Sequence, residues 1–420
     1  MIRAAFWATL GLLAYTYGVF PIVVLARGRL RRRPATEAPI TPTVSLIIAA
    51  RNEEAVIGQK LANVVALDYP HDRLEVIVVS DGSEDATDEI VRAAGDERVR
   101  LIAPGRVGKG RALGLGVAAS TGEILVFTDA NSQFEPGAIR ALARRFADPA
   151  VGGVAGNQVY RPEHRADIAA SGEQSYWDFD RALKRALSGA GNLTSATGAI
   201  YAIRREIFRP IPEGVTDDFM NSLQVIAQGR RLVFAEDAVA YETVAGTRRT
   251  EFRRKVRVAT RGLRCVFVRR ELLDVRRYGF FSIQLVSHKV LLRTMATPLI
   301  LLAATSARLA RRGGLYRLAA LGQAAFYGLG LIGLTVNDSR FGSSRLLAFP
   351  AYFILANAAA LMAVWNLLRG RAIDRWEPAR SARSGTTADA KPAEHTPAPS
   401  NPIIGDVPDS AGARFVGSRR

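Results

Sequence analysis

The feature that most constrains this chain is an uncharged run at residues 4–26. A helix of that length, rising about 1.5 Å per residue, can span a hydrocarbon core roughly 30 Å thick. A cluster of arginines follows at residues 27–33, whereas a cleaved signal peptide would carry its positive charge before the apolar run. We therefore predict that residues 1–27 form an uncleaved transmembrane anchor, with the N-terminus outside and the following chain in the cytoplasm.

Two further uncharged runs, residues 318–337 and 346–368, are also long enough to cross a membrane. A shorter apolar run at 294–307 contains Pro298 and is typical of an interfacial or re-entrant segment. If it crossed completely, the arginines on both sides of the last two runs would lie outside, against the positive-inside trend. We expect an incomplete crossing here, C-terminal membrane segments over residues 294–369, and a multi-pass protein of the cell (inner) membrane.

Charge and composition limit the partners. The chain carries 57 Lys and Arg against 39 Asp and Glu, a net charge of +18 that suits phospholipid head groups, nucleotide diphosphates or nucleic acid. The dense basic stretch from residue 248 has few aromatic side chains and adjoins the membrane. We therefore predict an amphipathic interfacial region at 251–293 and no nucleic-acid partner.

A single cysteine, Cys265, excludes an internal disulfide and a cysteine-built zinc site. Residues 378–420 lack large apolar side chains and are predicted to be a disordered tail.

Between residues 43 and 250, short apolar runs alternate with helical patterns, which is typical of β-α-β units and an α/β fold. This spacing predicts an open, mainly parallel sheet with helices on both faces. The predicted strands lie at 44–49, 76–79, 99–102 and 124–127. Ligands of such folds bind at the carboxyl ends of the strands, which selects Arg51, Glu53, Asp81 and Asp129.

Two other nucleotide-binding folds can be excluded by their glycines. The residues after the first strand, AARNEE at 49–54, contain no glycine where a dinucleotide-binding fold needs its G-x-G-x-x-G turn. The GKG at 108–110 lacks the first glycine and the Ser or Thr of a phosphate-binding P-loop. The chain is therefore predicted to be neither a dehydrogenase nor a P-loop NTPase.

Three acidic positions each allow a functional and a structural interpretation. Asp81 could accept hydrogen bonds from a nucleoside or could cap the helix that follows, a role that Asp85 could also fill. Asp129 and Asn131 could hold a divalent cation or form only a turn. Asp217 and Asp218 open a predicted helix, as ordinary capping residues do, yet either could also serve as a carboxylate base. The placement of Asp81 and Asp129 after successive strands of one sheet favours a shared nucleotide and metal site.

These motifs together resemble the family-2 glycosyltransferases, the inverting GT-A group that includes cellulose, chitin, hyaluronan and poly-N-acetylglucosamine synthases. The resemblance covers residues 43–264, with a GT-A domain at 43–250. Its motifs are VSLIIAARNEE at 44–54, VVSDGS at 78–83, GKG at 108–110, TDAN at 128–131 and TDD at 216–218.

The resemblance implies a role for each matching residue. Donor binding would involve Arg51, Glu53, Asp81, Lys109 and Asp129, with Arg254 and Arg257 stabilising the diphosphate that leaves. Asp129 and Asn131 would bind Mg²⁺ or Mn²⁺. Asp218, paired with Asp217, would be the catalytic base, and Thr197, Gly198 and Ala199 would line the acceptor site.

Two departures from the family pattern bear on the expected metal binding and on processive synthesis. Asn131 stands where an acid usually completes the D-x-D motif, which leaves fewer charges for the metal. The processive members carry Gln-x-x-Arg-Trp, whereas residues 254–258 read RKVRV and lack the tryptophan. The expected function is transfer of a hexosyl or N-acetylhexosaminyl group from a nucleotide-diphosphate sugar, a UDP-sugar first, to a polysaccharide or lipid-linked acceptor hydroxyl. The alternative is a non-catalytic membrane protein that binds nucleotide sugars.

Overall fold

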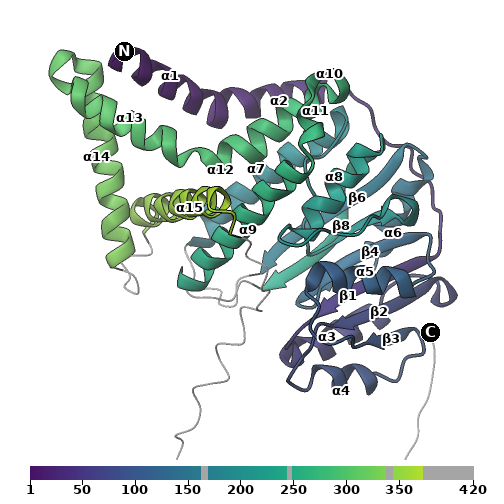
Figure 1. Ribbon diagram of the computed structural model, residues 1–420. Coiled ribbons are helices and arrows are strands. Elements are labelled where there is room, and N and C mark those ends of the chain that lie inside the picture. Colours follow the sequence, from purple (N-terminus) through teal and green to yellow (C-terminus); the bar gives the residue numbers. More distant parts are fainter. Residues whose placement is uncertain (162–168, 244–247, 337–343, 372–420) are drawn as a thin grey trace, which may run out of the picture. The chain divides into compact units, whose positions relative to one another are not determined.

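The computed structural model describes residues 1–161, 169–243, 248–336 and 344–371 (Figure 1). All of them belong to one compact unit, Met1–Ala379. The predicted tail at 378–420 lies outside the described residues.

Within the described residues, a single sheet of eight strands forms the centre of the soluble domain, in the order β3-β2-β1-β4-β7-β6-β8-β5. The strands are β1 (Val44–Ala50), β2 (Leu74–Ser80), β3 (Val99–Ile102), β4 (Ile124–Asp129), β5 (Ser132–Phe134), β6 (Val151–Arg161), β7 (Tyr201–Arg204) and β8 (Arg231–Thr243). The first four in this order pair in parallel, and β6 pairs in parallel with β8, whereas β7 and β5 pair antiparallel with their neighbours. The predicted open, mainly parallel sheet is confirmed.

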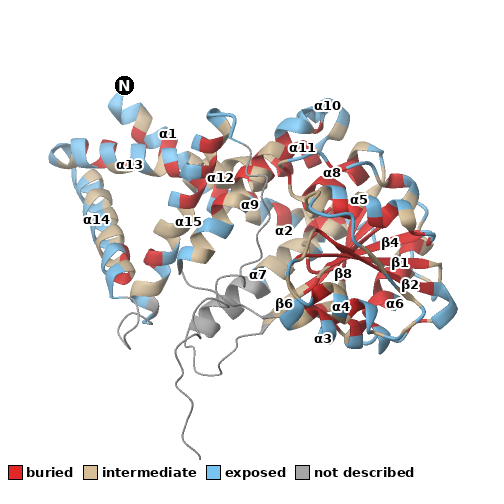
Figure 2. Ribbon diagram, turned by 60° about the horizontal axis from the view of Figure 1, so that its bottom comes forward, coloured by how far each residue is buried: buried red, intermediate tan, exposed pale blue. Residues whose placement is uncertain are grey.

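Helices cover both faces of this sheet, which explains why its central strands are continuous apolar runs. Along β1, Leu46 and Ile48 point into one core and Ile47 and Ala49 into the other. The first core is closed by α3 (Glu54–Val65), α4 (Thr87–Arg92) and α6 (Ala138–Ala143). The second is closed by α5 (Lys109–Ala119) and α8 (Asp217–Ala227). Figure 2 shows the buried strands between these helices.

The N-terminal helix is continuous through α1 (Ile2–Ala14), a π-helical turn at Tyr15–Val19 and α2 (Phe20–Leu30). Phe6 packs against Leu302 and Leu309, which lie in a C-terminal helix. Phe20 and Val24 join the second core of the soluble domain, beside α7 (Ala169–Ala190). The N-terminal helix is therefore packed into the core of the soluble domain and is not only tethered to it.

The C-terminal part of the described chain is helical. It contains α9 (Arg248–Val268), α10 (Val275–Tyr278), α11 (Phe280–Leu285), a π-helical turn at Val286–Leu291, α12 (Leu292–Thr294), α13 (Ala296–Leu309), α14 (Gly314–Thr335) and α15 (Arg345–Leu368). The basic stretch thus forms one helix, α9, and α15 packs along it.

Three helical stretches of the described residues are long and apolar enough to cross a membrane: Ile2–Leu30, Gly314–Thr335 and Leu346–Leu368. They coincide with the three uncharged runs of the sequence. The fourth region is the pair Phe280–Thr294 and Ala296–Arg312, bent by 59°, which suits either a broken span or a re-entrant loop. The incomplete crossing of this region remains a prediction.

Candidate active site

Lys109 lies where three elements of the domain meet. It is the first residue of α5, and its Nζ lies 2.7 Å from Asp129 Oδ1 at the end of β4 and 3.2 Å from Asp217 Oδ2 at the start of α8. Burial acts to lower the pKa of Lys109, but the charges of the two aspartates raise it above its ordinary value. Burial likewise acts to raise the pKa of Asp129, and Lys109 holds it below its ordinary value. The lysine is therefore a fixed positive charge between two carboxylates.

Asp218, the next residue, differs electrostatically from Asp217. Among the described residues it has no lysine or arginine within ion-pair distance, and its Oδ1 accepts the backbone N–H of Phe219 at 2.7 Å. Burial and the neighbouring charge of Asp217 raise the pKa of Asp218 to about 6. A carboxylate with a pKa near working pH combines a useful ionised fraction with a real affinity for a proton, as a general base requires.

Asp81 positions the loop that precedes Lys109. Its buried carboxylate accepts the backbone N–H groups of Val107 at 2.6 Å and Gly108 at 2.7 Å. Asp85 instead accepts the N–H of Thr87, the first residue of α4. The structure therefore does not use Asp81 as the cap of α4. It links the end of β2 to the loop of the central lysine, and its predicted contact with a nucleoside stays a prediction.

Arg51 and Glu53 follow β1 at the same edge of the sheet. Arg51 is buried, and its Nη2 lies 4.0 Å from Glu84 Oε1. The N–H of Glu53 donates to Thr87 Oγ1 at 2.8 Å, and its carbonyl accepts the first N–H groups of α3. These contacts bring both residues to the segment that follows β2, where Asp81 lies.

The predicted acceptor stretch packs directly against Asp129. A Cβ atom added to Gly198 would lie 2.9 Å from Asp129 Oδ2. The carbonyl of Ala199 accepts the hydroxyl of Thr128 at 2.8 Å. Among the described residues, the buried Oγ1 of Thr197 has no hydrogen-bond partner, so it is a polar atom that a ligand could satisfy.

Asn131 makes a contact that the sequence did not indicate. Its Nδ2 donates to Glu242 Oε1 at 3.1 Å, and Gln158 Nε2 donates to the other carboxylate oxygen. Burial and the charge of Asp129 raise the pKa of Glu242. Glu242 is thus a second acid, after Asp129, at this edge of the sheet. It contacts Asn131, which stands where the D-x-D motif usually has an acid.

Lys60 is a second residue that sequence reasoning missed. It is fully buried beneath the turn between β4 and β5, where its Nζ donates to Thr128 Oγ1 at 3.1 Å and to the carbonyl of Ser132 at 2.5 Å. The same ammonium lies 3.9 Å from the centroid of the Phe134 ring. Burial lowers the pKa of Lys60 to about 7. This lysine fixes the turn that carries Asp129 and Asn131.

The two arginines predicted to face the leaving group are placed differently. Arg254 is held by Glu251 through two contacts, Nε to Oε2 at 2.8 Å and Nη2 to Oε1 at 3.0 Å. Arg257, further along α9, contributes its charge to the lowered pKa of Asp129. The charge of Arg254 in turn acts to lower the pKa of Glu242, so both arginines act on acids at this edge.

The residues at this edge fit a divalent cation that arrives with a diphosphate. The described residues contain no cluster of three or more His, Cys, Asp or Glu that could hold a metal by themselves. Asp129 nevertheless supplies a hard oxygen ligand, and magnesium is commonly bound by one or two carboxylates together with substrate phosphates. Asp129, with Asn131 or Glu242 beside it, would provide the protein share of such a site.

The sheet order and the acids at its carboxyl edge define a class, the GT-A glycosyltransferases. Residues 45–211 match the profile of Glycosyl transferase family 2, so the chain carries a family-2 glycosyltransferase domain. The solved mannosyltransferase PcManGT from Pyrobaculum calidifontis, in complex with GDP-Man and Mn²⁺, superposes with a TM-score of 0.67. It is 25% identical in sequence, and the match covers 88% of this chain and 100% of that one.

Two sequence relatives agree with this assignment. The chain is 29% identical over 234 residues to a probable glycosyltransferase, YdaM, of Bacillus subtilis (strain 168), a match that covers 52% of this chain and 54% of YdaM. It is 37% identical over 116 residues to the beta-monoglucosyldiacylglycerol synthase of Synechocystis sp., covering 26% of this chain and 24% of the relative. The chain thus spans about half the length of one of these curated relatives and a quarter of the other.

Proposed function

We propose that this protein is a membrane-bound, inverting glycosyltransferase that moves a hexosyl or N-acetylhexosaminyl group from a nucleoside-diphosphate sugar to an acceptor hydroxyl. The observation that carries the proposal is the Lys109 bridge between Asp129 and Asp217, with Asp218 beside it. In this proposal Lys109 faces the diphosphate and Asp218 accepts the proton, and both lie at the same edge of the sheet. The bound GDP-Man and Mn²⁺ of PcManGT support a nucleotide-sugar donor and a divalent cation.

In the mechanism that follows, Asp218 accepts the proton of the acceptor hydroxyl. The oxygen attacks the anomeric carbon from the side opposite the diphosphate, a C–O bond forms as the bond to the diphosphate breaks, and the configuration inverts. Lys109 and Arg257 face the negative charge that develops on the leaving group, where preorganised cations are most effective. A divalent cation, when bound at Asp129, would add further charge stabilisation there.

Catalysis on the cytoplasmic side of the inner membrane follows from the same proposal. The arginines at 27–33 directly precede the domain, and Lys and Arg favour the cytoplasmic side of a spanning helix. In this proposal the three apolar helices hold the site at the membrane.

The experiment uses the full-length protein in membranes, incubated with labelled UDP- and GDP-sugars in turn. We expect one donor to give a labelled lipid or polymer fraction that requires a divalent cation. Donor binding without any transfer, under conditions where the protein is folded, would favour the non-catalytic alternative.

A further inference from the structure

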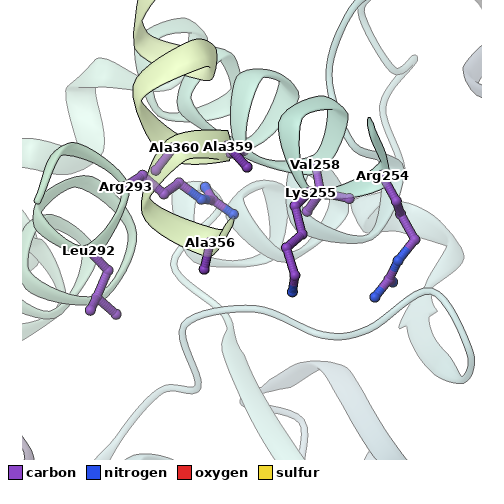
Figure 3. Close-up of a pocket in the computed structure, with 9 residues that line it drawn as sticks. Arg254, Lys255, Val258, Leu292, Arg293, Ala356, Ala359 and Ala360 are labelled. Carbon is purple, nitrogen blue, oxygen red and sulfur yellow. The ribbon is translucent and has the colours of Figure 1, made fainter. Parts of the chain in front are cut away.

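A cavity of about 240 Å³ lies between α9, α12 and α15, outside the cluster around Lys109 (Figure 3). One part of its wall is cationic, with Arg254 and Lys255 from α9 and Arg293 from α12. Another part is apolar and consists of small residues of α15: Ala356, Ala359 and Ala360. α15 is one of the three helical stretches of the described residues that are long and apolar enough to cross a membrane.

The cationic wall holds more positive than negative charge. Arg254 and Lys255 share one acid, Glu251, at 2.8 Å and 3.0 Å. Arg293 has no ion pair among the described residues, and its Nη1 is buried without a hydrogen-bond partner. The charge of Asp218 acts on Arg293 without an ion pair between them, so the compensation of this wall is incomplete and an anionic ligand would stabilise it.

The cavity is connected to the catalytic pair through Arg293. The guanidinium carbon lies 5.8 Å from the centroid of the Phe219 ring, and Phe219 directly follows Asp218. Gly262 of α9 permits this position, since a Cβ atom there would overlap the guanidinium. The cavity is therefore linked to the neighbourhood of Asp218 through Arg293 and Phe219, and Lys109 and Asp129 are not among its lining residues.

We propose that this cavity holds the phosphate group of the acceptor, so that the acceptor is a phosphate-bearing membrane lipid. Arginine side chains bind phosphate through paired, charge-assisted hydrogen bonds, and the alanine face of α15 accommodates the adjoining hydrocarbon chain. This inference rests on the transferase function proposed above, and it narrows the acceptor to one chemical class.

The test measures lipid binding to the full-length protein in detergent solution, without any transfer reaction. The probes are dioctanoyl phosphatidic acid, dioctanoylglycerol with the same chains and no phosphate, and inorganic phosphate. We expect phosphatidic acid to bind about tenfold or more tighter than dioctanoylglycerol or inorganic phosphate. Only phosphatidic acid has both a phosphate for the cationic wall and acyl chains for the alanine wall. Equal binding of the neutral lipid would overturn the proposal, and equal binding of inorganic phosphate would reduce the cavity to an anion site without a lipid role.

Three variants locate the binding. Arg293→Gln removes the unpaired cation, and Ala359→Leu fills the cavity from α15 without changing any charge. Each should weaken phosphatidic acid binding about tenfold or more. Arg253→Gln is the matched control, since Arg253 is an exposed cation of α9 outside the cavity and its loss should leave binding unchanged. Unchanged binding in both cavity variants would show that phosphatidic acid does not bind in this cavity.

Nucleotide-sugar binding is measured in the same samples to separate the two proposals. A protein that binds the donor but no phosphate-bearing lipid keeps its proposed function and loses this inference. A protein that binds the lipid but none of the nucleotide sugars contradicts the proposed function itself.

Discussion

At the scale of single residues, two adjacent aspartates have different chemistry because their surroundings differ. Asp217 is compensated by Lys109, whereas Asp218 is half-buried beside the charge of Asp217 and has no such partner among the described residues. Environments that separate the pKa values of neighbouring acids also separate their roles. We therefore assign proton acceptance to Asp218 and charge balance to Asp217.

The substitution Asp218→Asn tests this division. An amide keeps the shape and the hydrogen bond from Phe219 but cannot accept the acceptor's proton. Loss of a general base costs on the order of 10² to 10⁴ in rate, so turnover should nearly stop while the Kd for the donor stays close to that of the wild type. Single-turnover rates and donor titrations measure the two quantities. Near wild-type turnover would make Asp217 the next candidate base.

The pH dependence gives an independent check on Asp218. Because the base acts when ionised and its pKa is raised to about 6, kcat/KM should fall as the pH drops below about 6. The same raised pKa also determines how stability changes with pH. The native state binds the proton of Asp218 more tightly than the unfolded chain does, since the Asp pKa of an unfolded chain is about 3.9. The free energy of unfolding should therefore decrease as the pH rises from about 4 to about 6. Asp218→Asn should make this pH dependence weaker. Unfolding titrations of both proteins over this range would show it.

Asp129 and Glu242 make unequal contributions to the predicted cation site. Asp129→Ala should abolish the dependence of donor binding on Mn²⁺, since it removes the carboxylate nearest to Lys109. Glu242→Gln should weaken that dependence less, because the amide keeps the shape and Asn131 remains. Calorimetric titration of a nucleoside diphosphate with Mn²⁺ and with EDTA measures both effects. Identical metal dependence in Asp129→Ala and the wild type would exclude Asp129 from the site.

At the scale of elements, the site depends on a close fit between the end of β4 and the loop before β7. Gly198 leaves no room for a side chain, since its Cβ would lie 2.9 Å from Asp129 Oδ2. We predict that Gly198→Ala displaces Asp129 and lowers donor affinity about tenfold or more, with the fold retained. Gly114→Ala in α5 is the control, because no atom lies within 4 Å of the added Cβ and alanine favours a helix by roughly 0.5–1 kcal/mol. Equal donor affinity in the two variants would contradict the fit.

The elements near the start of the domain were predictable because their signals are local. The apolar runs of β1, β2 and β4 and the polar residues that follow them stand out in the sequence, and in parallel neighbours those carboxyl ends meet at one edge. Glu242 was missed because it reaches Asn131 only through the pairing of β5 with β8, strands far apart in the chain. Lys60 lies on the apolar face of α3 beside Ile57, Leu61 and Val64, and the polar contact that fixes its ammonium, with Thr128, comes from a distant strand. No local pattern reports such long-range contacts.

At the scale of the whole molecule, the membrane helices and the sheet form one packed unit. Phe20 and Val24 of the N-terminal helix belong to the same core as β1 and α8, and α15 packs along α9. The catalytic edge is therefore fixed relative to the apolar helices by side-chain packing and not by a flexible linker. This packing also holds the cavity between α9, α12 and α15 at a fixed position relative to Asp218.

The number of crossings remains to be tested, and the chain itself offers the means. Its single cysteine, Cys265, is buried, so new cysteines can be labelled against a low background. With three spans, Arg312→Cys and Arg371→Cys should both face the cytoplasm and react with an impermeant maleimide only after permeabilisation. Ser344→Cys, exposed at the start of α15, should react in intact cells. If the bent pair Phe280–Thr294 and Ala296–Arg312 crosses completely, the pattern reverses at all three positions. Three spans would agree with the positive-inside trend, because the arginines that flank these helices would lie in the cytoplasm. A complete crossing of the bent pair would place these arginines outside, against that trend.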